Sequence, residues 1–145
     1  MVDSADAHTV TDNPTSNPGY IQARITFNLS ELQNASKEYI VATIFHECLH
    51  AYIMNTRTDS TSNDESHELM ATSANIDLVA NAIRETCNNR ISLQEARDLA
   101  WGGLYKSSAK TIDTQGFLNL SSSDQVRIKE TNVDFKYGSS GKQCK

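Results

Sequence analysis

Alternation of apolar and polar side chains marks the first regular element of the chain. From Ile21 to Leu29 every second residue is apolar and the residues between them are polar. A period of two places one row of side chains on a core and the other row in water. The pattern therefore predicts a half-buried β-strand over residues 21–29.

A denser apolar pattern at helical spacing follows the strand. Ser36 can act as the N-cap, and from Lys37 to about Met54 apolar residues recur too closely for a strand. We expect a long, largely buried helix here. Residues 55–65 are polar and predict a loop, after which a second helix is expected from Ser66 to about Cys87.

Two further helices are expected in the C-terminal half. Ser92 can cap a third helix, which ends near Gly102 and Gly103, and residues 121–135 predict a weaker fourth helix. Trp101 and the two glycines are candidates for a binding groove, although an aromatic residue at a helix end belongs more often to the core. These elements predict a mostly helical α+β fold with a small sheet.

The first 19 residues differ from the rest in composition. They combine Asp, Ser, Thr and Asn with two prolines and contain almost nothing to bury, so residues 1–19 predict a polar tail or linker. The remaining stretch, residues 20–145, has the size of one ordinary domain. We therefore expect a single folded domain that follows a tail.

Composition and charge limit the classes of partner that we expect the protein to bind and the cellular locations that we expect for it. A net charge of -5 and a pI of about 5.3 provide no basic surface for nucleic acid, and no apolar run reaches the ~20 residues that span a bilayer. The N-terminus lacks the basic and apolar blocks of a signal peptide. We expect no nucleic-acid or membrane partner, and a chain that is either cytoplasmic or exported as part of a larger protein.

The three cysteines, Cys48, Cys87 and Cys144, contain no CxxC pair, which argues against a zinc ribbon. Cys48 lies in the first predicted helix. Cys87 and Cys144 are therefore the pair that could form a disulfide.

Catalytic chemistry is indicated by His46-Glu47-Cys48-Leu49-His50, an HExxH motif in the first predicted helix. Residues four apart share a helix face, so the two imidazoles can bind one metal ion, and Glu47 beside them can reach a water molecule on that ion. A catalytic zinc takes about three protein ligands and keeps one position open. A third ligand must therefore come from elsewhere in the chain.

His67 is the first candidate for the third zinc ligand. The chain has four histidines, and His8 falls in the predicted tail, which leaves His67 at the start of the second helix. Helical steps from His67 lead to the apolar residues Ala71, Ala74 and Leu78. We therefore expect His67 on a helix face that packs inward. Glu68 is the alternative ligand, because a glutamate from a second helix can also complete such a site.

The stretch from His46 to Ile53, with a polar loop and a further histidine after it, resembles the SprT-like zincins, the family that includes the protease Spartan. The resemblance covers about residues 21–85. It implies a minimal zincin fold over residues 20–145, in which the edge strand of a small sheet, residues 21–29, borders the active-site cleft. It also implies that zinc is held by His46, His50 and His67, and that Glu47 is the general base.

The expected function is that of a zinc metalloendopeptidase acting on a protein or peptide substrate. Zinc polarises the scissile carbonyl and activates water, and Glu47 transfers the proton. A further donor is needed for the developing oxyanion, and Tyr52, Tyr105 and Tyr137 are candidates.

Two alternatives stay open. One is a catalytic toxin effector of a larger secreted polypeptide, with a cognate inhibitor or immunity protein as its partner. The other is a non-catalytic zinc-binding interaction domain, in which the metal would normally have four protein ligands.

Overall fold

A computed structural model of the chain describes residues 5–11, 22–56, 62–107, 110 and 112–142. Within these ranges the order of elements is β1 (Ala7–Thr11), β2 (Ala23–Phe27), α1 (Leu29–Leu32), α2 (Lys37–Thr56), α3 (Asn63–Met70), α4 (Ser73–Thr86), α5 (Leu93–Ala100), α6 (Gln115–Leu118) and α7 (Ser122–Lys136). The two strands form one antiparallel sheet. The structure is mostly helical, and the predicted α+β class is confirmed.

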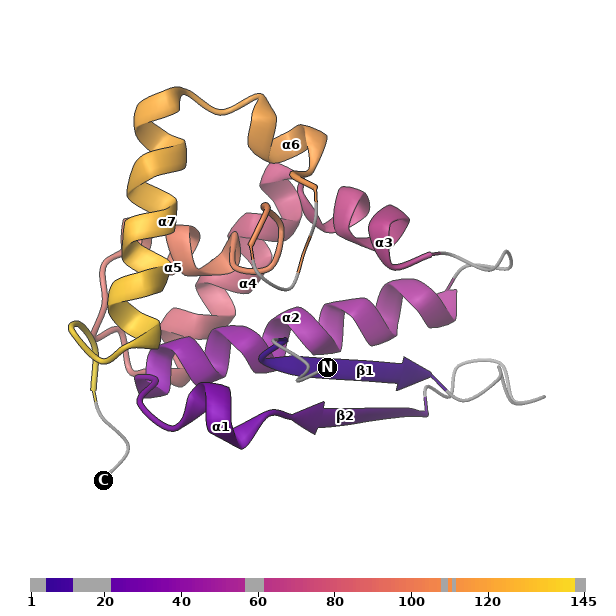
Figure 1. The fold of residues 1–145 in the computed structure, drawn as a ribbon, viewed down its shortest axis with the longest axis horizontal. Helices are drawn as coiled ribbons and strands as arrows, with labels where there is room; N and C mark the ends of the chain where they lie inside the picture. The colour runs from indigo at the N-terminus through magenta and orange to yellow at the C-terminus, as the bar shows by residue number, and fades with distance from the viewer. Residues whose placement is uncertain (1–4, 12–21, 57–61, 108–109, 111, 143–145) are drawn as a thin grey trace.

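Helix α2 is the element around which the others are arranged (Figure 1). It contacts β1 on one side and α3, α4, α5 and α7 on the other. The strands lie along the lower side of α2 in this view, and the remaining long helices stand above it. The HExxH motif, which α2 carries, therefore lies between the sheet and the helical part of the molecule.

The core of the helical part forms where α4, α5 and α7 meet. Its most completely buried large side chains are Phe117, Ile83, Leu99, Leu104 and Ile128, and each such residue contributes roughly 1.5–3 kcal/mol by leaving water. Trp101 is also buried in this cluster, so its side chain belongs to the core. This packed scaffold positions the segment from Gly102 onwards, which runs beside α2.

Three of the four predicted helices are confirmed. The first corresponds to α2, whose N-terminus is capped by Ser36, since the Tyr39 amide donates to Ser36 Oγ at 3.2 Å. The third and fourth correspond to α5 and α7. Their N-caps are Ser92 and Ser121, and each hydroxyl accepts a backbone N–H of the first turn.

The predicted second helix is in fact two helices, so the expectation of one helix from Ser66 to Cys87 is wrong. The first, α3, begins earlier at a Ser62 capping box, and Thr72 is the N-cap of the second, α4. The Thr72 hydroxyl accepts the Asn75 amide, which gives the chain a local alternative to continuous helix. Because the axis changes at the break, Ala74 and Leu78 are exposed and do not share an inward face with His67.

The prediction that residues 1–19 form a polar tail or linker is wrong over Ala7–Thr11, which form β1. This strand pairs with β2 in a register that runs from Ala7 opposite Phe27 to Thr11 opposite Ala23. The predicted strand at 21–29 is confirmed over its central residues as β2. Since β1 lies between α2 and β2, the strand beside the helix that carries the motif is β1 and not the predicted one.

The structure bears on one of two smaller predictions. Among the residues that it describes, no helix is long and apolar enough to cross a membrane. Cys87 is buried, but its expected disulfide partner, Cys144, lies outside the described ranges.

Candidate metal centre

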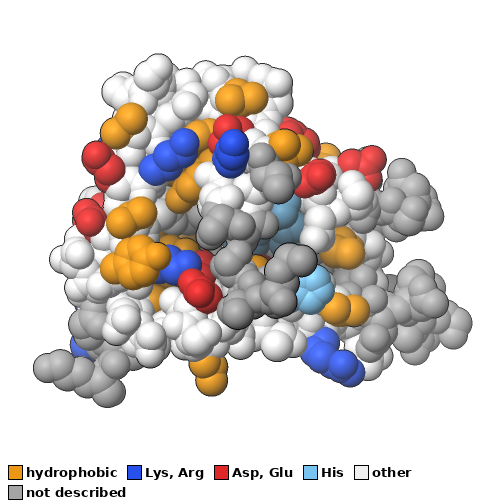
Figure 2. Space-filling model, viewed as in Figure 1, with side chains coloured by type: hydrophobic (Ala, Val, Ile, Leu, Met, Phe, Trp, Pro, Cys, Tyr) orange, Lys and Arg blue, Asp and Glu red, His pale blue; other side chains and the backbone are white. Residues whose placement is uncertain are grey.

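A cleft with a volume of about 400 Å³ opens along α2. One wall is formed by the start of β1 and the face of α2 that carries the motif, and the other wall by residues of the 99–110 segment and the end of α7. In Figure 2, histidine side chains are visible near the middle of this face of the molecule. The cleft therefore joins the HExxH motif to residues from both ends of the chain.

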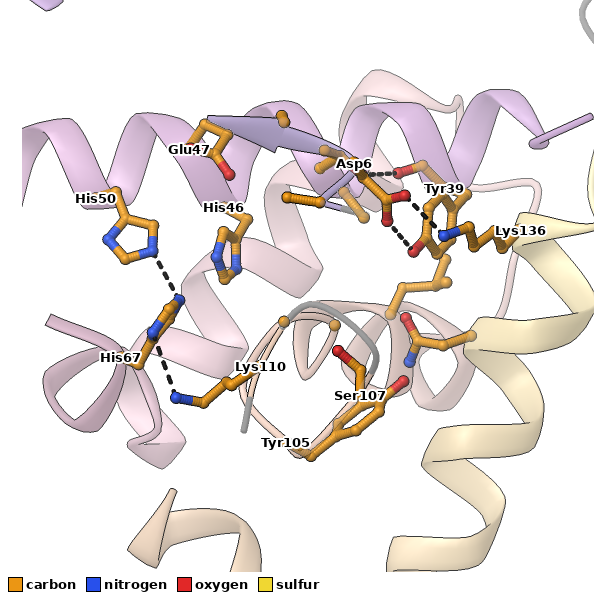
Figure 3. A pocket seen from close by; sticks show the side chains of 18 of the residues that line it. Asp6, Tyr39, His46, Glu47, His50, His67, Tyr105, Ser107, Lys110 and Lys136 are labelled. Atoms are coloured by element: carbon orange, nitrogen blue, oxygen red, sulfur yellow. Dashed lines mark hydrogen bonds and ion pairs between the residues drawn. The ribbon is translucent and has the colours of Figure 1, made fainter. Parts of the chain in front are cut away.

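The structure brings His46, His50 and His67 together at one end of the cleft (Figure 3). One ring nitrogen from each lies within 4.8 Å of the other two. His50 Nε2 and His67 Nε2 are 2.9 Å apart. Nitrogen ligands of one tetrahedral zinc lie about 3.3 Å apart, given Zn–N bonds of 2.0–2.1 Å, so small side-chain movements suffice to fit a metal among the three imidazoles.

Ser66 fixes the orientation of His50. The Ser66 hydroxyl lies 2.7 Å from His50 Nδ1 and donates its own proton to the Asn63 carbonyl at 2.9 Å. It must therefore accept the Nδ1 proton of His50, which leaves His50 Nε2 as an acceptor whose lone pair points toward the other histidines. Such a partner behind a histidine is the usual support of a metal ligand.

His46 lies against the backbone at Gly102 and Gly103. Gly103 has φ +79, and a methyl group on its Cα would lie 2.7 Å from His46 Cε1, so the ring occupies space that only a glycine leaves free. The Gly102 carbonyl favours the protonated form of the ring. Nevertheless, His46 Nδ1 is buried without a partner of normal hydrogen-bond geometry among the described residues.

Burial keeps all three imidazoles neutral. Burial first, and then neighbouring positive charge, lower the pKa of His50 to about 3 and that of His67 to about 4. The pKa of His46 is well below its ordinary value, first because of burial and then because of the other two histidines. Neutral imidazoles are the form that binds metal. Three such rings at one point, one with an unpartnered buried nitrogen, fit a divalent zinc-like ion.

Glu47 is buried next to the three histidines and contacts β1. Its Oε2 accepts a hydrogen bond of 2.5 Å from Thr9 Oγ1, and this residue is itself buried. Burial raises the pKa of the Glu47 carboxyl, while the Thr9 hydrogen bond and the charge of His8 act in the opposite direction. A carboxylate with a raised pKa accepts a proton more readily at neutral pH.

His67 has a second partner in Lys110. The Lys110 ammonium lies 3.5 Å from His67 Nδ1 and 3.3 Å from Asp64 Oδ1. Because His50 Nε2 is an acceptor, His67 Nε2 is the donor in the contact between the two rings, and His67 Nδ1 then accepts from Lys110. Lys110 is thus part of the same hydrogen-bond chain as the histidines.

The far end of the cleft is held by Asp6. One of its carboxylate oxygens accepts the Tyr39 hydroxyl at 2.6 Å, and the other accepts the Lys136 ammonium at 2.7 Å. Lys136 is also paired with Glu31 at 3.3 Å. These bonds connect the start of β1 to α2 and α7, so β1 is fixed along the cleft as one of its walls (Figure 3).

The structure places most of the site residues that the sequence predicts at the cleft. His46, His50 and His67 converge, and Glu47 lines the same cleft. Glu68 lies outside the group and accepts the Gln115 amide at 3.0 Å. Of the three tyrosines considered as oxyanion donors, Tyr105 and Tyr137 line the cleft and Tyr52 does not.

Four residues of the site are not predicted by the sequence: His8, Thr9, Ser66 and Lys110. His8 and Thr9 fall in the stretch predicted to be a tail, and His8 is exposed on β1 at the cleft. The sequence could have indicated Ser66, because it directly precedes the candidate ligand His67 in a predicted helical turn. It gave no such indication of Lys110, since this residue comes from a segment without a regular pattern.

Neither protein-family models, nor curated proteins, nor solved structures gave a match to this chain. The likeness to SprT-like zincins therefore stays a prediction from the motif.

Proposed function

We propose that this protein is a zinc-dependent metallopeptidase that hydrolyses peptide bonds in the cleft along α2. The observation that carries the proposal is the convergence of His46, His50 and His67 beside a buried carboxylate, Glu47, which faces the same cleft. This combination supplies metal ligands and a proton acceptor at one point.

The roles of the residues follow from their positions. A zinc ion held by the three histidines would polarise the scissile carbonyl and lower the pKa of a bound water to ~7. Glu47 accepts a proton from the attacking water as its oxygen bonds to the carbonyl carbon. When the carbon–nitrogen bond breaks, Glu47 delivers this proton to the leaving amine. Thr9 holds one oxygen of Glu47, and the other oxygen would accept the proton of the water.

A purely structural zinc site is the less favoured alternative. Structural zinc usually has four protein ligands, and among the described residues the group that can hold a metal has three members. The remaining coordination position can be taken by water or substrate. The cleft of about 400 Å³ beside it also supports an enzyme, because a peptide needs access to the metal.

The test is cleavage of a proteome-derived peptide library, with new termini identified by mass spectrometry. We expect the zinc-loaded parent to cut a defined set of peptides and Glu47→Gln to cut them at least 10²-fold more slowly, because the amide cannot accept a proton. Glu130→Gln makes the same change on an exposed position of α7 and should cleave as the parent does. Equal cleavage by Glu47→Gln and the parent would refute the proposed role of Glu47, and no zinc-dependent cleavage by the parent would refute the peptidase.

A further inference from the structure

Lys110 is a buried cation in the cleft, and its contacts with the described residues do not account for its burial. Its side chain is 8% exposed, whereas that of its ion-pair partner Asp64 is 68% exposed. A pair with one exposed member adds little stability, and removing an ammonium from water is costly. An apolar side chain of similar length would fill the same space without that cost.

The position of Lys110 is also unfavourable for metal binding, so its presence there calls for another explanation. Its ammonium lies 3.5 Å from a nitrogen of His67, and its positive charge disfavours protonation of all three histidines. The same charge would repel a divalent cation held by them. A cation retained beside a metal site is useful when negative charge develops there.

The hydrogen-bond pattern indicates how the Lys110 ammonium can become free to donate into the cleft. His67 can bind a metal through Nε2 only if its proton moves to Nδ1, because Nε2 is the donor in its present contact with His50. His67 Nδ1 then no longer accepts from Lys110. The ammonium keeps Asp64 as an anchor at 3.3 Å and has donors free to point into the cleft.

We propose that Lys110 is a catalytic residue that stabilises the negative charge on the scissile carbonyl oxygen; this inference rests on the proposed function. In Figure 3, Glu47 and Lys110 lie on opposite sides of the three histidines. Water can therefore lose its proton to Glu47 on one side while the carbonyl oxygen gains negative charge near Lys110 on the other. When the carbon–nitrogen bond breaks, the carbonyl re-forms and the ammonium keeps its own proton throughout.

The tyrosines considered from the sequence are less well placed. Tyr52 is 56% exposed and does not line the cleft. Tyr105 packs against Phe117, with ring centroids 5.0 Å apart, and in Figure 3 it lies farther from the histidines than Lys110. Tyr137 follows Lys136 at the end of α7, in the part of the cleft held by Asp6.

The experiment uses an oxyanion probe, so it does not depend on knowing the substrate. Parent, Lys110→Met and Lys110→Arg are loaded with Co²⁺, and acetohydroxamate is titrated while the visible spectrum of the metal is recorded. We expect Lys110→Met to keep its metal affinity, or to gain some, and to bind the hydroxamate about 10–100-fold more weakly, as for loss of a charged hydrogen bond. Lys110→Arg should retain part of the binding.

Lys106→Met is the matched control, because it removes the same charge from an exposed position in the same segment. It should bind the hydroxamate as the parent does, whereas an equal loss would point to the overall field and overturn a contact role. The role is also overturned if metal-loaded Lys110→Met binds the hydroxamate as tightly as the parent, or if it cannot hold metal. A parent that binds metal and hydroxamate without cleaving peptides contradicts the proposed peptidase alone.

Discussion

Replacement of Gly103 by alanine tests whether the backbone at the cleft positions His46. Gly103 has φ +79, a conformation that costs an L-residue roughly 1–2 kcal/mol. The added methyl carbon would also lie 2.7 Å from His46 Cε1, so the ring has to move. We expect a fall in melting temperature of about 2–8 °C from the backbone strain, and a metal affinity that is about 10–100-fold weaker, as for loss of other supports of a metal ligand.

Gly141→Ala separates the two effects. Gly141 has φ +78, and a methyl group there would lie 2.6 Å from Glu38 Oε2, outside the metal centre. This variant should lose stability and keep the metal affinity of the parent when both are folded. Calorimetry and competitive zinc titration of the two variants provide the comparison. If Gly103→Ala bound zinc as tightly as Gly141→Ala, the proposed support of His46 by this glycine would be wrong.

Three further outcomes follow from the site. In the presence of chelator, the free energy of unfolding should fall as pH decreases below 6.5, because the unfolded state binds protons that the folded state excludes. The lowered pKa of His50, about 3, accounts for roughly 2 kcal/mol of this loss at pH 5. Urea titrations that show no such fall would contradict this prediction. Ser66→Ala should weaken zinc binding about 10–100-fold by removing the acceptor behind His50, and an unchanged titration would exclude that role. Thr9→Val should move the acidic limb of kcat/KM to higher pH, since the Thr9 hydrogen bond lowers the pKa of Glu47; an unaltered profile would argue against Glu47 as the base.

Much of the fold and the centre of the site could be predicted from the sequence, because the relevant signals are local. His46, Glu47 and His50 fall within one helical turn of each other, and α2 follows from its apolar pattern and its Ser36 cap. His67 was found by elimination among four histidines. It does reach the site, although the inward helix face expected for it is absent because α3 ends at Met70.

The missed residues depend on contacts between distant parts of the chain. Thr9 lies 38 residues from Glu47, and Lys110 lies 43 residues from His67. A five-residue polar strand such as β1 is stable only because it pairs with β2 and packs on α2. Its sequence alone therefore gives too weak a pattern to distinguish a strand from a tail.

The central claim is that His46, His50 and His67 together hold one metal ion, and competitive zinc titration of two adjacent variants tests it most directly. The parent should bind one zinc per chain. His67→Ala should lose several orders of magnitude in affinity, because one of three ligands is removed. Glu68→Gln should bind zinc as the parent does, since the Glu68 carboxylate accepts the Gln115 amide and a glutamine oxygen can still do so. Circular dichroism confirms that each variant is folded. If His67→Ala retained the zinc and Glu68→Gln lost it, the assignment of the metal centre would be contradicted.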